Sequence, residues 1–167
     1  SFGVGERLIT AGSEPVFGGV YKLSALEKNG RMIPKIKKSE NVEKITNPGF
    51  KSVFRLFDKD SNRALADVIV LDGETIPEGE EYELFDTEAV WKRKKIRNFY
   101  VKNLREKIFE GGKCVYRCPE IEEITDYCAK QLDAMWDEMK RFENPPTSFV
   151  DLSYNLWKLK HDMIEEL

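Results

Sequence analysis

The sequence predicts an α+β fold, with a β-hairpin-rich half followed by two C-terminal helices. Three observations support this prediction. Asn29-Gly30 lies between two extended runs, a second pair of β-like segments follows, and the last third carries apolar residues at helical spacing. Strands that come first along the chain, with helices after them, are typical of α+β domains, and we expect the helices to cover one side of the strands.

The first predicted hairpin joins the extended runs Val20–Leu26 and Arg31–Lys37. Its turn is Asn29-Gly30, because both central positions of a tight hairpin turn need a positive φ, which these two residue types tolerate. A loop then leads to Asn47-Pro48-Gly49, which has the composition of a turn.

A second hairpin is predicted from Ser52–Phe57 and Leu65–Leu71, joined by the polar segment Asp58–Asn62. This segment also resembles the start of a calcium-binding loop. The similarity ends at Arg63, where such a loop needs glycine, and at Ile69, where it needs a bidentate glutamate. We therefore expect an ordinary hairpin turn.

The chain between the second hairpin and the first helix is predicted to be loop and short strands. Leu71–Glu81 is loop-like, and Tyr82–Phe85 is a short strand. Further extended chain reaches Ile108, and the turn Glu110–Lys113 leads back toward Cys114–Tyr116.

The first predicted helix follows Pro119 and continues to Asn144-Pro-Pro146. Glutamates in its first turn favour the positive end of the helix dipole. Its apolar residues form one stripe that we expect to pack against the strands: Ile121, Ile124, Cys128, Leu132, Met135 and Met139. The second helix is predicted to begin near Ser153, a suitable N-cap, with the apolar face Leu156, Leu159, Met163 and Leu167.

Composition indicates a globular chain with no general affinity for nucleic acid or membrane. The 167 residues are 41% hydrophobic and 34% charged, with a net charge of −3. A nucleic-acid surface needs a basic excess, and the basic run Lys92–Arg97 is flanked by acidic segments, so we expect a solvated face near a strand. Phosphate contact or partner binding is the alternative for this run. No apolar stretch approaches the length of a membrane span. Three cysteines do not suggest a disulfide scaffold, which favours a cytoplasmic protein.

Residues of the usual catalytic and metal-binding types are scattered. Cys114, Cys118 and Cys128 lack the fourth ligand and the spacing of a structural zinc site, so no metal site is predicted. His161 is the only histidine, and we interpret it as a surface residue of the last helix. No nucleophile–histidine pair or catalytic carboxylate pair is recognisable, and no catalytic residue is assigned to this segment.

Gly3 and Gly5 flank one residue and precede an apolar run. Glycines at this spacing let backbone N–H groups converge on an anion, although an ordinary turn has the same spacing.

Several sequence blocks occur in a fixed order: Phe2-Gly-Val-Gly5, Leu8-Ile-Thr10, Gly18-Gly-Val-Tyr-Lys-Leu23, the block from Ser39 to Gly49, and Phe149-Val-Asp-Leu-Ser153 followed by Leu156-Trp-Lys-Leu159. Together they closely resemble the C-terminal part of the nicotinate phosphoribosyltransferase family. The most specific parts are Gly-Gly-Val-Tyr-Lys and Glu-Lys-x-Thr-x-Pro-Gly, and the resemblance spans almost the whole chain.

The resemblance implies two domains. Residues 1–18 resemble the end of an irregular (β/α) catalytic barrel, and residues 19–167 resemble an appended α+β domain. It also implies that the turn containing Gly3, Gly5 and Glu6 binds the phosphate of phosphoribosyl pyrophosphate. The family commonly has threonine or serine where this chain has Glu6, and a carboxylate there repels phosphate unless it turns away or meets a cation.

The family joins nicotinate to phosphoribosyl pyrophosphate, giving nicotinate mononucleotide for NAD synthesis. The resemblance implies ATP hydrolysis through a phosphorylated histidine, magnesium, and a homodimer. The main catalytic residues of the family belong to upstream segments, so we expect this segment alone to bind no cofactor and to be inactive. A non-catalytic interaction or scaffold module derived from this family is the alternative function. We expect it if the natural polypeptide begins near Ser1.

Overall fold

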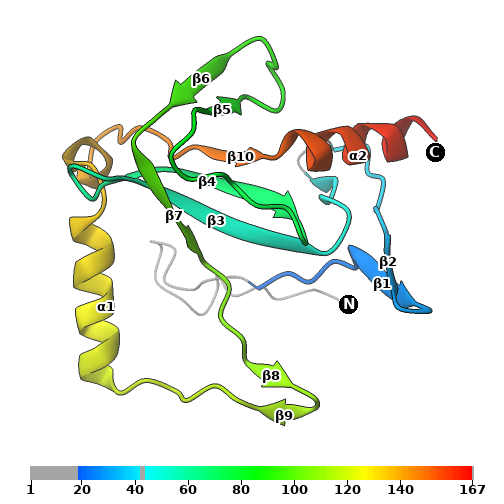
Figure 1. Ribbon diagram of the computed structural model, residues 1–167, viewed down its shortest axis with the longest axis horizontal. Helices are drawn as coiled ribbons and strands as arrows, with labels where there is room; N and C mark the ends of the chain where they lie inside the picture. Colours follow the sequence, from blue (N-terminus) through cyan, green and yellow to red (C-terminus); the bar gives the residue numbers. More distant parts are fainter. Residues whose placement is uncertain (1–18, 42–43, 167) are drawn as a thin grey trace, which may run out of the picture.

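The computed structural model describes residues 19–41 and 44–166, and a four-stranded sheet forms its centre (Figure 1). The strands lie in the order β10-β4-β3-β7, with β10 parallel to β4 and the other neighbours antiparallel. Their bounds are β3 (Lys51–Asp58), β4 (Ala64–Leu71), β7 (Phe99–Asn103) and β10 (Val150–Leu152). The predicted second hairpin is thus confirmed as β3 and β4.

The main core lies on one face of this sheet, where β4 alternates buried and less buried side chains. Leu56 pairs with Ala66 across the hairpin and Phe54 pairs with Val68, so these four side chains share a face. The buried cluster on that face is Leu56, Ala66, Val68, Val70, Ile76, Leu84, Ile96 and Phe99. Leu84 and Ile96 come from a separate hairpin, β5 (Tyr82–Phe85) and β6 (Arg93–Ile96), which therefore covers the sheet.

Two further hairpins project from the sheet (Figure 1). The predicted Asn29-Gly30 turn is confirmed: it joins β1 (Ala25–Lys28) to β2 (Arg31–Pro34), with φ of 53° and 71° at the two residues. The described residues before Ala25 are not strand, so β1 is shorter than predicted. The other hairpin is β8 (Phe109–Glu110) and β9 (Lys113–Cys114).

The connection between β3 and β4 is a hairpin turn, as predicted, and is closed by one carboxylate. Asp58 Oδ1 accepts hydrogen bonds from Ser61 N at 2.8 Å and Ser61 Oγ at 2.7 Å. Asn62 completes the turn with a φ of 57°. The carboxylate that a calcium loop needs for its ion is thus used to hold the backbone.

Helix α2 (Tyr154–Glu165) follows β10 directly and packs on the sheet, as predicted. Ser153 is its N-cap and accepts a hydrogen bond from Leu156 N at 3.2 Å. Leu156 is fully buried, and the ring of Trp157 meets Phe85 edge-on with centroids 6.1 Å apart.

Helix α1 (Ile121–Asp133) departs from the prediction in length and in packing. It begins with the expected acidic first turn but ends at Asp133, and a short 3-10 helix (Asp137–Lys140) follows Trp136, whose backbone is extended. The helix stops there because its end is tied to β4. Ala64 N donates to Ala134 O at 2.8 Å, and Trp136 Nε1 donates to Ala64 O at 2.7 Å.

The predicted burial of the α1 stripe is wrong. Ile121 is 76% exposed and Leu132 is 49% exposed, and α1 has no buried residue. Only the C-terminal end of the helix reaches the sheet, so its first turns extend away from the core (Figure 1). Met135 and Met139, beyond the helix, are half-buried.

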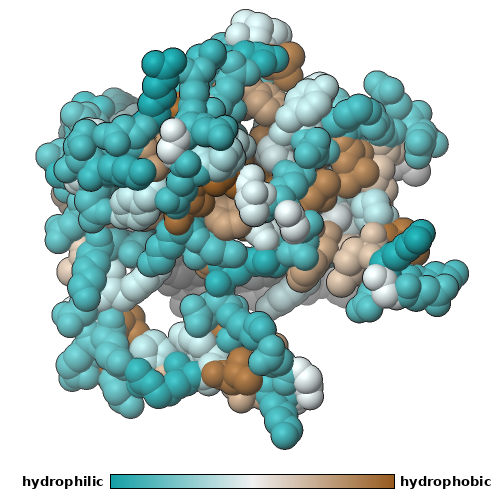
Figure 2. Space-filling view, viewed as in Figure 1, coloured by the Kyte–Doolittle hydropathy of each residue, from teal (hydrophilic) through white to brown (hydrophobic). Residues whose placement is uncertain are grey.

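The visible surface is mostly hydrophilic, with hydrophobic residues gathered over the middle of the molecule toward α2 (Figure 2). The α+β class is confirmed. Within the described ranges, neither helix has the length and apolar character needed to cross a membrane.

Candidate functional site

The phosphate-binding turn predicted from Gly3, Gly5 and Glu6 lies outside the described residues. That assignment therefore remains a prediction. The other sequence candidates can be placed in the structure.

His161 lies on α2 and is half-buried against an aromatic side chain. Its ring centroid is 4.1 Å from that of Trp157, and its Nδ1 is 2.8 Å from Trp157 O. Because a carbonyl oxygen can only accept, Nδ1 donates this hydrogen bond. His161 thus sits on the helix as predicted, but it is less exposed than a surface residue, and no bond in the described chain joins it to a nucleophile.

The three cysteines are exposed and free. Cys128 was expected on a buried stripe, and its exposure follows from the outward position of α1. Among residues 19–41 and 44–166, no group of three His, Cys, Asp or Glu side chains is placed to hold a metal ion.

The basic run Lys92–Arg97 contains strand β6 (Arg93–Ile96), and its charged residues are exposed, as predicted. Three of its five cations are paired with acids: Lys95 Nζ lies 2.6 Å from Glu81 Oε1, Arg97 also contacts Glu81, and Arg93 Nη1 lies 2.5 Å from Glu83 Oε1. Paired charges at a solvated surface leave little positive potential for a nucleic acid.

A cleft of about 490 Å³ lies between the β5–β6 hairpin and β10, and a buried carboxylate lines it. Asp151, in the middle of β10, is 7% exposed. No described residue donates a hydrogen bond to its carboxylate. Lys92 and Lys94 line the same cleft, and the Lys94 ammonium lies 5.4 Å from the centre of the Phe149 ring.

Burial raises the pKa of Asp151 to about 6, and the Asp86 carboxylate adds to the shift. Asp86 itself stays ionised, because backbone hydrogen bonds from Ala89 and Glu88 lower the pKa of its carboxyl. Burial also raises the pKa of Tyr82, on β5, to about 12, so its phenol stays protonated.

Asp151 can therefore exchange a proton near pH 6 and accept hydrogen bonds from a group that enters the cleft. Thr87 and Ser148 line the same cleft, but among the described residues no hydrogen bond joins a hydroxyl to the Asp151 carboxylate, so no nucleophile–base pair is formed there. The sequence analysis did not single out Asp151. An acid inside the apolar run Phe149–Leu152 was the signal that identifies it.

These features define the chain's class as an α+β domain with one shared core, whose described part has no nucleophile–base pair or metal cluster. Residues 50–160 match the family model described as "Nicotinate phosphoribosyltransferase C-terminal domain". The chain belongs to this nicotinate phosphoribosyltransferase C-terminal domain family.

Several whole proteins named nicotinate phosphoribosyltransferase are similar to nearly the full chain. The Bacillus subtilis protein is 39% identical over 166 residues, which cover 99% of this chain and 34% of that protein. The Homo sapiens protein is 30% identical over 162 residues, which cover 96% of this chain and 29% of that protein. The chain thus spans about a third of the length of the relatives it matches.

The fold is also similar to one in a solved structure, the crystal structure of human nicotinic acid phosphoribosyltransferase. The superposition has a TM-score of 0.64 at 23% sequence identity, and it covers 71% of this chain and 24% of that one. At this identity the similarity concerns the fold.

Proposed function

We propose that this chain is the C-terminal region of a nicotinate phosphoribosyltransferase. The complete enzyme makes nicotinate mononucleotide from nicotinate and phosphoribosyl pyrophosphate, with ATP hydrolysis, for NAD synthesis. The observation that carries the proposal is the 39% identity to the Bacillus subtilis protein across 99% of this chain. Because this sequence identity extends over nearly the whole chain, it includes the residues of the core as well as those of the loops.

In this proposal the chain supports catalysis and does not perform it. The described residues hold one buried cluster and a cleft with a single perturbed carboxyl, whereas catalysis needs several groups preorganised around the reacting atoms. Residues 19–167 then form the appended domain, and residues 1–18 belong to the end of an upstream catalytic barrel. Gly3 and Gly5 contribute to binding the ribosyl phosphate.

The remaining parts of the proposal follow from the family resemblance. Magnesium and ATP act in the complete protein, which is a cytoplasmic homodimer. None of these is assigned to residues of this chain.

The alternative function is a non-catalytic interaction or scaffold module derived from the same family. The observation in its favour is that no nucleophile–base pair occurs in the described part of the chain. Intact mass and N-terminal sequencing of the native protein distinguish the two. A polypeptide with about three times this length supports the enzyme, and one that begins near Ser1 supports the module.

The isolated chain is predicted to be inactive. Incubation of residues 1–167 with nicotinate, phosphoribosyl pyrophosphate, ATP and magnesium should give no nicotinate mononucleotide above a blank. The Bacillus subtilis relative, assayed in parallel, is the positive control. Turnover by the chain at a rate typical of enzymes, about 1 s⁻¹ or faster, contradicts its assignment as a supporting domain.

A further inference from the structure

A cavity beside the β1–β2 hairpin is lined by four lysines and, among the described residues, by no acid. Its volume is about 770 Å³. The lysines are Lys22, Lys37, Lys44 and Lys51. This concentration of positive charge is unexpected in a chain with 30 acidic and 27 basic residues.

Three chain segments form this lysine cavity, and hydrogen bonds hold them together. Gly49 N donates to Ser24 O at 2.7 Å, and Lys37 N donates to Thr46 Oγ1 at 3.3 Å. The segments bring together the two sequence blocks that carry the family resemblance most specifically, because Lys22 belongs to one block and Lys44 to the other. The proposed function assigns no specific role to the residues of these two blocks.

Lys51 is the most fixed of the four lysines. Its Nζ donates to Asn47 O at 2.8 Å and to Gly49 O at 2.6 Å. An ammonium has three donors, so one remains for a group inside the cavity. Partial burial lowers the pKa of Lys51, and a negative charge nearby would compensate for the lost solvation.

The four lysines have no ion-pair partner within the described ranges. Cations elsewhere in the chain do have such partners; Arg55, for example, makes hydrogen bonds of 2.7 and 2.8 Å to Asp67. Like charges gathered around one space repel each other, and an anion at the centre removes that repulsion.

The other polar residues that line the cavity indicate which kind of ligand it can bind. Hydroxyl groups of Ser24, Ser39 and Thr46 line the cavity and can donate to anionic oxygens. Asn47 also lines the cavity and adds a polar side chain to its wall. Several lysines acting as point charges suit a group with more than one negative charge, as phosphate carries.

We propose that the lysine cavity binds a small phosphorylated ligand, with its phosphate groups held by Lys22, Lys44 and Lys51. The proposal assigns this role to lysines between Lys22 and Lys51 and makes no use of Gly3 or Gly5. Its binding can be measured without any enzymatic activity, so a failure here leaves the proposed function untouched.

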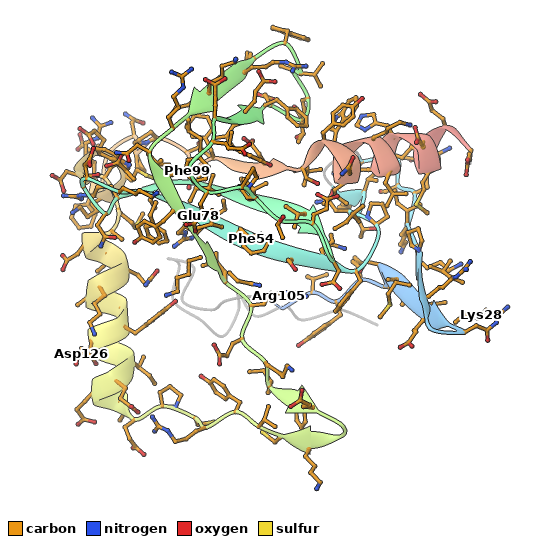
Figure 3. All side chains as sticks on the ribbon, in the orientation of Figure 1. Lys28, Phe54, Glu78, Phe99, Arg105 and Asp126 are labelled. Carbon is orange, nitrogen blue, oxygen red and sulfur yellow. The ribbon has the colours of Figure 1, made fainter. Side chains whose placement is uncertain are left out.

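The test is calorimetric titration of the 167-residue chain with inorganic pyrophosphate at low salt. We expect one site per chain, with an affinity that falls as salt is raised. The double variant Lys22→Gln/Lys44→Gln should bind at least tenfold more weakly. Lys28→Gln is the matched control, because Lys28 lies at the tip of the β1–β2 hairpin outside the cavity lining (Figure 3). It should bind like the wild type.

Separate titrations with ADP, adenosine and inorganic phosphate identify the source of the phosphate group. Binding of ADP without adenosine assigns a nucleotide, and binding of pyrophosphate alone assigns a free polyphosphate. No saturable binding of any phosphate compound at millimolar concentration overturns the proposal. If Lys28→Gln weakens pyrophosphate binding as much as the double variant does, the proposal is also overturned, because affinity then depends on the net charge of the protein and not on the cavity. Circular dichroism confirms that each variant is folded.

Discussion

Asp151 is the residue whose environment differs most from that of a surface carboxyl. It lies on β10, the three-residue strand at one edge of the sheet, beside the β5–β6 hairpin, and it is buried. The folded chain holds its proton up to a pH of about 6, whereas the ordinary pKa of the group is 3.8. Because the carboxyl ionises more easily in the unfolded chain, its ionisation as the pH rises above about 4 favours unfolding and destabilises the fold.

Asp151→Asn should stabilise the protein at neutral pH. The amide removes the ionisation penalty, which develops between about pH 4 and 6 and persists at higher pH. We expect a gain of up to about 2 kcal/mol in the free energy of unfolding at pH 7.5. The gain should shrink toward pH 4, where the wild-type carboxyl is neutral in the folded state. Urea melts at pH 4.5 and 7.5 measure the difference.

Asp126→Asn is the control, because Asp126 lies on the exposed surface of α1 (Figure 3). It should change stability equally little at both pH values. An Asp151→Asn effect that does not vary with pH would show that the carboxyl is not desolvated in the folded protein.

Gly5→Val tests the predicted phosphate turn in a chimera, defined as the Bacillus subtilis relative with its matching third replaced by this chain. A side chain at Gly5 occupies space that the phosphate needs or forces an unfavourable φ. Loss of one charge-assisted hydrogen bond costs about 1.5–3 kcal/mol, which is about tenfold or more in affinity. Calorimetry should show this loss for phosphoribosyl pyrophosphate, with an unchanged melting temperature. Unchanged affinity would assign the turn a structural role.

The hairpins could be predicted at the level of elements because their signals are local. Asn29-Gly30 determines one turn, and alternation determines the β3–β4 pair. The end and the packing of α1 could not be predicted, because both depend on Ala64, which is far away along the chain. An apolar stripe shows that a helix is amphipathic, but it does not show which surface covers it.

A leucine-to-alanine substitution should destabilise the protein much more in α2 than in α1. Leu156 is fully buried in α2, so Leu156→Ala should cost about 2–5 kcal/mol of unfolding free energy. Leu132 is 49% exposed on α1, so Leu132→Ala should cost less than about 0.5 kcal/mol. Denaturant melts of the isolated chain provide both values. A large loss for Leu132→Ala would mean that α1 packs against the sheet after all.

For the whole molecule, the sequence predicted the class of fold and the family, but neither of the polar sites in the structure. The Asp151 cleft forms between β10 and a hairpin more than fifty residues earlier in the chain. The lysine cavity forms where three loop segments meet. Such sites depend on tertiary packing, and single residues such as Lys44 or Asp151 carry no local signal of it.

The proposed function makes this chain the supporting C-terminal domain of a nicotinate phosphoribosyltransferase. The chimera with the Bacillus subtilis relative provides the decisive measurement, its rate of nicotinate mononucleotide formation from nicotinate, phosphoribosyl pyrophosphate, ATP and magnesium. We expect a rate within about tenfold of the intact relative, and no activity when the matching third is deleted and not replaced. A chimera that is folded, as judged by a cooperative melt, yet as inactive as the deletion would contradict it.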